Sequence, residues 1–148
     1  MGAFTQINYQ IVFSTKFRNP TITHGFDKEL YYYITKVLKE KNCKPLGVNG
    51  MPDHLHILTG LHPSVCLADL VKDIKLSTSD MMKGNPKFPL FDYWQSGYAA
   101  FTYSFNDVRR VFNYVKNQKR HHMGVNYYDE LKAMLIANGI EFDEKYLL

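Results

Sequence analysis

The pattern of hydrophobic and polar residues near the start of the chain predicts a strand followed by a helix. Segment 6–14 begins with alternating polar and apolar residues and then becomes apolar, which is typical of a strand that ends at the polar, proline-containing stretch 15–20. Over 26–41 the apolar residues recur at helical spacing, and Asn42 follows as a stop signal.

A hairpin is expected next along the chain. Residues 45–48 read as a short strand, and Asn49-Gly50 is the dipeptide most typical of a tight turn between two strands. The partner strand would then run over 53–59, before Gly60. We therefore predict a pair of antiparallel strands joined at Asn49-Gly50.

The second half of the chain adds a helix, a strand and two further helices. Residues 65–82 have helical periodicity, and the aromatic-rich segment 97–103 predicts a strand. A helix from near residue 104 to about residue 122 follows, and a last helix covers about 128–137. The order β-α-β-β-α-β plus two helices predicts an α+β, ferredoxin-like split β-α-β fold: a four-stranded antiparallel sheet with helices on one face plus C-terminal helices.

Composition narrows the classes of protein that remain. The chain of 148 residues is 45% hydrophobic and 22% charged, which fits one folded domain and excludes a disordered chain. Apolar runs stay well short of the ~18 residues that a membrane span needs, so we expect a cytoplasmic protein without a membrane partner. Cys43 and Cys66 form no CxxC pair, which disfavours a disulfide scaffold or a cysteine zinc site. The net charge of +4 permits a nucleic-acid partner without demanding one.

Two histidines on the second strand of the predicted hairpin form the first candidate site. Side chains two residues apart on a strand lie on the same face, roughly 6.5–7 Å apart, so His54 and His56 project together. Two imidazoles at this distance can bind one divalent cation or one phosphate. Alternatively, both histidines only decorate an exposed face of the sheet. Asp53 could orient a histidine or cap the turn.

The helix after the last strand carries the second candidate site. Tyr114 and Gln118 lie four residues apart, hence on one side of a helix, at the boundary between core and solvent. Much of the remaining surface of this helix is basic. The alternative interpretation is a solvated basic face with a half-buried tyrosine. The basic residues are Arg109, Arg110, Lys116, Lys119 and Arg120.

Together the two motifs resemble a known family. Segment 52–58, Pro-Asp-His-Leu-His-Ile-Leu, is similar to the HUH motif (His, bulky hydrophobic, His) of the single-tyrosine transposases of the IS200/IS605 type. Segment 114–118, continuing to His121-His122, is similar to the catalytic-tyrosine helix of that family. The related repeat-associated tyrosine transposases share this core. The resemblance covers nearly the whole chain, so residues 1–148 are expected to form a single domain of this kind. Further segments that resemble the family are 9–20, 94–101 and 139–147.

The resemblance implies a metal-dependent enzyme that cleaves and rejoins single-stranded DNA without ATP and recognises hairpins at the ends of its element. By analogy, His54, His56 and Gln118 would hold a divalent metal, Mg²⁺ or Mn²⁺. Tyr114 would attack a DNA phosphate and leave a 5′-phosphotyrosine and a free 3′-OH. Members of the family work as homodimers with composite active sites, so a second copy of the chain is an expected partner.

Basic side chains are expected to contact the phosphates of the bound DNA. Two alternatives to a transposase stay open. A ferredoxin-like module could bind single-stranded nucleic acid without cutting it, by stacking bases on exposed aromatic residues. A domesticated transposase would keep the motifs without mobilising an element. The expected DNA contacts are Lys16, Arg18, Arg109 and Arg110.

Overall fold

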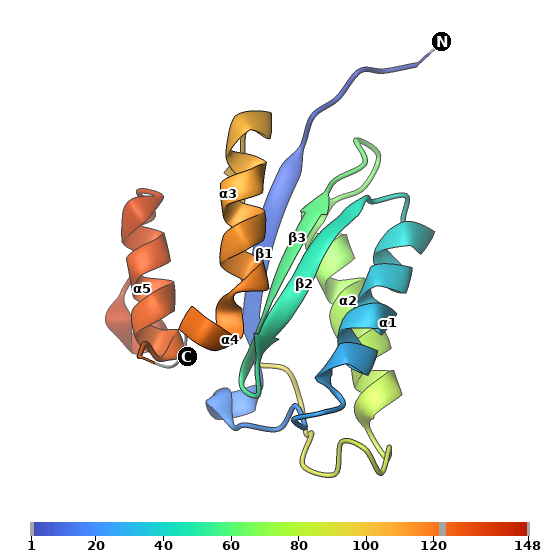
Figure 1. Ribbon diagram of the computed structural model, residues 1–148, viewed down its shortest axis with the longest axis vertical. Coiled ribbons are helices and arrows are strands. Elements are labelled where there is room, and N and C mark those ends of the chain that lie inside the picture. Colours follow the sequence, from blue (N-terminus) through green and yellow to red (C-terminus); the bar gives the residue numbers. More distant parts are fainter. Residues whose placement is uncertain (1, 122–123, 148) are drawn as a thin grey trace.

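The computed structural model describes residues 2–121 and 124–147 and is built on one antiparallel sheet with helices on both faces (Figure 1). The strand order is β2-β3-β1-β4, and the three neighbouring pairs are antiparallel. This is the order of the split β-α-β arrangement, so the predicted fold class is confirmed. The strands are β1 (Asn8–Ser14), β2 (Pro45–Met51), β3 (His54–Gly60) and β4 (Ala99–Tyr103).

Helices α1 (Asp27–Glu40) and α2 (Leu67–Met82) cover one face of the sheet (Figure 1). Because side chains alternate along a strand, Phe13 of β1 and Ile57 of β3 point into this layer, where both are buried. They pack with Leu30 of α1 and Ile74 of α2 in the larger hydrophobic core. No helix in the described part of the chain is long and apolar enough to cross a membrane.

The opposite face is covered by α3 (Phe105–Lys116), α4 (Gln118–His121) and α5 (Tyr127–Ala137). Leu58 of β3 packs against Val111 and Val115 of α3, and Val12 of β1 packs in a cluster with Leu131 of α5. This is also the face that carries the two histidines of β3. Among the described residues there are also two short 3-10 turns, η1 (Lys16–Arg18) and η2 (Glu144–Tyr146).

The hairpin between β2 and β3 turns at residues 52–53, so the prediction of a turn at Asn49-Gly50 is wrong. Asn49 lies within β2, and its Nδ2 donates to two carbonyl oxygens at the C-terminal end of α3, at 3.1 and 3.0 Å. A Cβ on Gly50 would lie 2.2 Å from the carbonyl oxygen of His54. Glycine is therefore needed here for close approach of two strands, and the tight turn belongs to the residues that follow.

The helix predicted from near residue 104 to about residue 122 is divided in two. Helix α3 ends at Lys116, Asn117 leaves the helical conformation, and α4 begins at Gln118. The Asn49 side chain donates to the last two carbonyl groups of α3 and so stabilises the end of that helix at the division. Tyr114 and Gln118 consequently stand on different helices, and His122 lies outside the described residues.

Candidate active site

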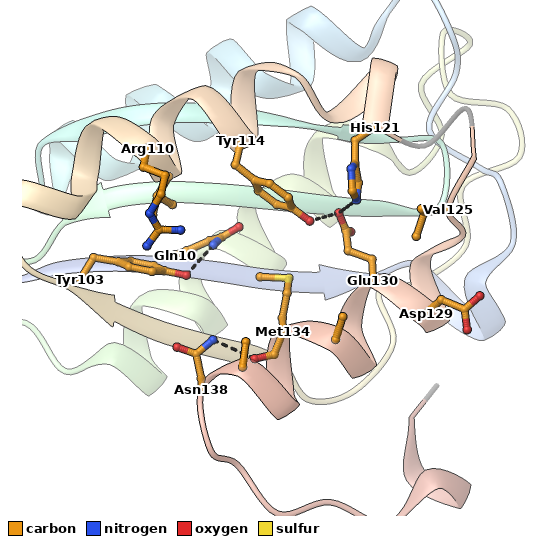
Figure 2. Close-up of a pocket in the computed structure, with 13 residues that line it drawn as sticks. Gln10, Tyr103, Arg110, Tyr114, His121, Val125, Asp129, Glu130, Met134 and Asn138 are labelled. Atoms are coloured by element: carbon orange, nitrogen blue, oxygen red, sulfur yellow. Dashed lines mark hydrogen bonds and ion pairs between the residues drawn. The ribbon is translucent and has the colours of Figure 1, made fainter.

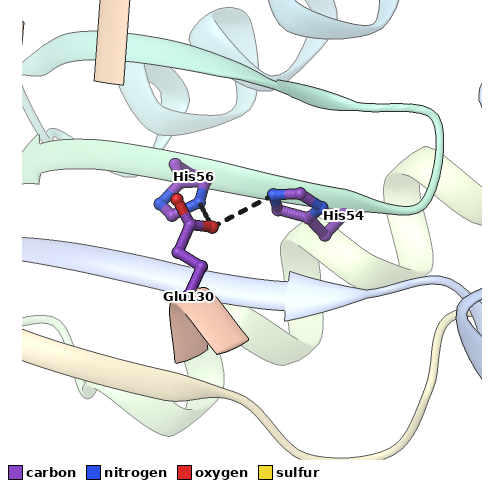
Figure 3. A group of neighbouring side chains, drawn as sticks. All are labelled: His54, His56 and Glu130. Carbon is purple, nitrogen blue, oxygen red and sulfur yellow. Dashed lines mark hydrogen bonds and ion pairs between the residues drawn. The ribbon is translucent and has the colours of Figure 1, made fainter. Parts of the chain in front are cut away.

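His54 and His56 project from β3 beneath the C-terminal helices, and neither side chain is exposed to solvent. Their ring centroids are 5.2 Å apart. Glu130, from the first turn of α5, reaches both rings: its Oε1 lies 3.3 Å from His54 Nε2 and 2.8 Å from His56 Nε2 (Figure 3). The ligand-type atoms of these three buried residues lie within 4.8 Å of one another, which is close enough to share one metal ion.

The partners of the two Nδ1 atoms determine which way each imidazole presents its lone pair. Asp53 Oδ1 lies 2.7 Å from His54 Nδ1, and a carboxylate can only accept, so that nitrogen carries the proton. Gln10 Oε1 lies 2.7 Å from His56 Nδ1, while Gln10 Nε2 donates to the Tyr103 hydroxyl at 3.0 Å. Both Nε2 atoms are therefore oriented to act as ligands, the arrangement typical of metal-binding histidines.

Protonation of His54 is governed by two opposing effects. Burial alone would lower the pKa of this imidazole, because a charged ring is poorly solvated in the interior. Hydrogen bonds with Asp53 and Glu130 outweigh burial, so the pKa lies above its ordinary value of 6.5. Without a cation, a proton on Nε2 is therefore the group that satisfies the neighbouring carboxylate.

The second oxygen of Glu130, Oε2, contacts the residues of the second motif. The Tyr114 hydroxyl donates a hydrogen bond to it, and Gln118 Nε2 donates at 3.0 Å. His121 Nε2 lies 3.5 Å from the same oxygen. Burial, followed by the hydrogen bond and charge of Glu130, raises the pKa of Tyr114 well above its ordinary value of 10.0. One carboxylate thus joins the histidine pair to the tyrosine.

The donor set fits a divalent cation. Gln118 donates through Nε2 to Glu130, so its Oε1 is turned toward the histidines and lies 3.4 Å from His54 Nε2. Two imidazole nitrogens, one carboxylate oxygen and one amide oxygen therefore converge as lone-pair donors. Such a mixed nitrogen and oxygen set suits Mn²⁺ or Zn²⁺ better than Mg²⁺, which prefers oxygen ligands.

A cavity of about 470 Å³ opens beside Tyr114, between α3 and α5 (Figure 2). Tyr114 and Glu130 line one end of it, Arg110 lies over Gln10 and Tyr103, and the side chain of Met134 enters from α5. A volume of this size is within the range of small-ligand sites. The cavity therefore provides access to the tyrosine from solvent.

The structure brings together four of the residues singled out in the sequence: His54, His56, Tyr114 and Gln118. All four belong to one chain, and the rings of His56 and Tyr114 are 5.8 Å apart. The expected DNA contacts do not join this cluster. Arg110 lines the cavity, Arg109 is exposed on α3, and Lys16 and Arg18 lie in η1, just after β1.

Glu130 was missed from sequence alone, because an acidic residue is common in the first turn of a helix and calls for no further role. Asn126 caps α5 by accepting from the Asp129 amide at 2.9 Å, and acidic residues are favoured in a first helical turn. A signal was nevertheless present: Tyr127 and Leu131 mark the apolar side of α5, and Glu130 falls beside them. A carboxylate on the buried side of a helix requires a partner.

Comparison with known proteins places these features in a family. The family model described as "Transposase IS200 like" matches residues 3–118, which include both motifs and end before α5. The ISDra2 transposase TnpA of Deinococcus radiodurans is 24% identical over 122 residues, covering 79% of this chain and 87% of that protein.

Two solved structures have the same fold. One is described as a transposase of Deinococcus radiodurans R1; it is 21% identical, with a TM-score of 0.61 over 80% of this chain and 95% of that chain. The other is a REP-associated tyrosine transposase bound to a REP hairpin; it is 15% identical, with a TM-score of 0.62 over 84% of this chain and 74% of that chain. The fold, the two motifs and the match over most of the chain agree: this chain belongs to the IS200-like transposase family.

Proposed function

We propose that this transposase cuts and rejoins single-stranded DNA in a metal-dependent reaction, through a 5′-phosphotyrosine bond to Tyr114. The observation that carries the proposal is the Glu130 carboxylate, which accepts a hydrogen bond from Tyr114 and also contacts both histidines. The candidate nucleophile and the candidate metal ligands thereby form one cluster, next to a cavity that opens to solvent.

His54, His56, Glu130 and Gln118 would hold the metal ion. Of the two ions expected from the sequence, Mg²⁺ and Mn²⁺, the mixed nitrogen and oxygen ligands favour Mn²⁺. The bound ion would polarise an oxygen of the scissile phosphate and help to orient it for in-line attack. Glu130 extends the ligand set expected from the sequence, which contained the two histidines and Gln118 only. Asp53 and Gln10 would keep the two imidazoles in the orientation that the ion requires.

Tyr114 would attack the phosphate while Glu130 takes its proton. A free tyrosine has a pKa of about 10, and burial raises the pKa of Tyr114 further, so the phenolate is not formed in advance. Glu130 Oε2 already accepts the hydrogen bond of this hydroxyl and is placed to receive the proton during attack. The new bond joins Tyr114 Oη to phosphorus, and the bond from phosphorus to the 3′ oxygen breaks.

The broken strand would leave with a 3′-OH whose proton comes from solvent, and Glu130 would release the proton of Tyr114 to solvent, so that the carboxylate is restored. The 3′-OH of another strand then attacks the phosphotyrosine and returns the proton to Tyr114. Each step exchanges one phosphate ester for another, so the reaction needs no ATP. The chain would therefore need only the metal ion as cofactor.

Hairpin-forming single-stranded DNA at the ends of the element is the proposed substrate. One solved relative is described as bound to a REP hairpin, which supports this choice. Arg110 stands at the cavity beside Tyr114, where a guanidinium can hold a phosphate of the incoming strand. Lys16, Arg18 and Arg109 are proposed as further phosphate contacts.

A homodimer remains part of the proposal, and the way in which two chains share the chemistry can be tested. In the single chain that the structure describes, Tyr114 lies beside its own histidines, so composite sites would require the tyrosine helices to exchange between two chains. A His54→Ala chain mixed with a Tyr114→Phe chain distinguishes the two modes. Recovery of cleavage would support composite sites, and no recovery would support cleavage within one chain.

A covalent-adduct assay tests the proposed function. The protein is incubated with hairpin DNA from the flanks of its own gene, with Mn²⁺, Mg²⁺ or chelator, and resolved on a denaturing gel. We expect a metal-dependent protein–DNA band that is lost in Tyr114→Phe and kept in the control Tyr32→Phe, whose ring is exposed on α1. An adduct that persists in Tyr114→Phe contradicts the assignment. DNA binding without an adduct under any metal favours a binding module or a domesticated transposase.

A further inference from the structure

The short turn η1, residues 16–18, has an unusual backbone. Phe17 and Arg18 are consecutive residues with positive φ, at 54° and 56°. Residues other than glycine rarely adopt this left-handed backbone conformation. Such conformations are unfavourable and persist only where the surrounding structure imposes them. Two in succession therefore indicate a backbone that is held in place.

The hydrogen bonds of the turn show what holds it. The Lys16 amide donates to the carbonyl of Tyr93 at 2.8 Å, and the Phe17 amide donates to Gln95 Oε1 at 3.0 Å. The Arg18 amide donates to the carbonyl of Thr15 at 2.9 Å. Three successive amides are thus bound by the segment before β4 and by the end of β1, so the turn is a fixed feature of the fold.

The aromatic side chain of the turn gains little burial in return. The Phe17 side chain is 66% exposed, so packing does not explain why an aromatic residue occupies this strained position. Lys16 Nζ lies 4.9 Å from the centroid of the Phe17 ring, and Arg18 follows on the other side in sequence. An exposed aromatic ring with a cation before it and after it in the sequence offers the groups with which proteins stack a base and hold its phosphates.

The turn lies at the active-site end of the sheet. Ser14, the last residue of β1, pairs with His54, and the Thr15 amide donates to the carbonyl of Asp53 at 2.9 Å. The Arg18 guanidinium lies 5.6 Å from the ring centroid of Tyr128, in the first turn of α5. In Figure 1 the blue turn after β1 stands at the same end as α4 and the start of α5.

We propose that Phe17 stacks one unpaired base of single-stranded DNA, while Lys16 and Arg18 contact the phosphates on either side of it. The site would hold the strand next to the metal-binding histidines without taking part in the chemistry. The proposal rests on the proposed function for the identity of the nucleic acid. Binding does not require the nucleophile, so it can be measured in a Tyr114→Phe chain.

Fluorescence anisotropy with two probes of equal length and charge tests the stacking. One probe is a labelled oligothymidylate, and the other is an abasic oligomer with the same sugar-phosphate backbone. We expect Phe17→Ala to weaken binding of oligothymidylate roughly 5- to 150-fold and to leave binding of the abasic oligomer unchanged. Phe17→Tyr keeps a ring and should bind as the parent chain does. The matched control is Phe105→Ala, which removes a ring that is 77% exposed at the start of α3.

Three results would overturn the proposal: unchanged binding of oligothymidylate by Phe17→Ala, an equal loss with the abasic oligomer, or an equal loss in Phe105→Ala. Thermal unfolding of each variant shows whether a loss reflects folding. If Phe17→Ala is unstable, Phe17→Leu, which keeps an apolar side chain but has no ring, supplies the answer: it should lose binding of oligothymidylate and keep binding of the abasic oligomer. Absence of a covalent adduct in the parent chain would contradict the proposed function and leave these binding measurements intact. The two failures are therefore distinguishable.

Discussion

The Tyr114 hydroxyl donates a hydrogen bond to the carboxylate of Glu130, sixteen residues further along the chain. The same carboxylate lies within hydrogen-bonding distance of His56 and is completely buried as a side chain. A buried anion must be compensated by donors or cations, and here the compensating groups are the candidate nucleophile and the candidate metal ligands. Any change in the charge of Glu130 should therefore affect both metal binding and the reaction of the tyrosine.

Glu130→Gln should weaken both functions together. The neutral amide cannot accept the tyrosine proton, and it removes the anionic ligand, so we expect adduct formation to fall roughly 100-fold or more. The affinity for Mn²⁺, measured by calorimetry, should fall by at least roughly tenfold. Asp129→Asn is the control, because it makes the same change at the neighbouring exposed position of α5. Parent-like Mn²⁺ affinity in Glu130→Gln would remove the carboxylate from the proposed ligand set.

Gln10→Leu should weaken metal binding although it replaces none of the candidate metal ligands. Gln10 is buried, and its Oε1 is the acceptor that fixes the proton of His56 on Nδ1. Loss of this acceptor frees the imidazole to adopt the wrong tautomer, so Mn²⁺ affinity should drop roughly 10- to 100-fold. The exposed Gln6→Leu is the matched control. If calorimetry gives the same affinity for both variants, Gln10 does not position the histidine.

The effect of the metal on stability should depend on pH. The pKa of His54 in the fold lies above 6.5, so its protonation stabilises the metal-free fold fully below that pH. This contribution is lost as pH rises through the folded pKa. A metal ion needs the same Nε2 without its proton, so the increase in melting temperature caused by Mn²⁺ should grow from about pH 6 to about pH 8. Thermal unfolding with Mn²⁺ and with chelator measures both trends, and an Mn²⁺ effect that does not vary with pH would contradict the assignment.

The sequence predicted most of the fold because its signals are local. Alternation and helical spacing identified the strands and helices in the correct order, and the two motifs lie within single elements or consecutive ones. Asn49 was misread and Glu130 was missed for the same physical reason. Each fits a local role suggested by its neighbours in sequence, a turn residue for Asn49 and an acid at a helix start for Glu130. Their actual partners come from α3 and β3, distant in sequence, and only the packed sheet brings them together.

Lys119 holds α4, the helix that carries Gln118, in place. Replacing Lys119 should therefore also affect the active site, although Lys119 is not part of it. Its Nζ lies 2.8 Å from Asp27 Oδ2 and donates to the carbonyl of Gly50 at 3.1 Å, joining α4 to α1 and β2. Lys119→Met should lower the free energy of unfolding by roughly 1–2 kcal/mol at neutral pH, since hydrogen bonds to a charged group are lost while part of the site stays solvated. It should also weaken Mn²⁺ binding, because Gln118 loses its support.

The pH dependence of this loss identifies the ion pair as its cause. Burial alone would raise the pKa of Asp27, but the hydrogen bond and charge of Lys119 outweigh it, and the pKa lies below its ordinary value of 3.8. The pair therefore stabilises the fold above that pH, and the contribution disappears as pH falls through the folded pKa. Denaturant unfolding of Lys119→Met should differ from the parent at neutral pH and converge with it in acid. Lys116→Met, at an exposed position of α3, should match the parent throughout. A difference that persists unchanged in acid would mean that Lys119 acts through packing of its aliphatic chain and not through Asp27.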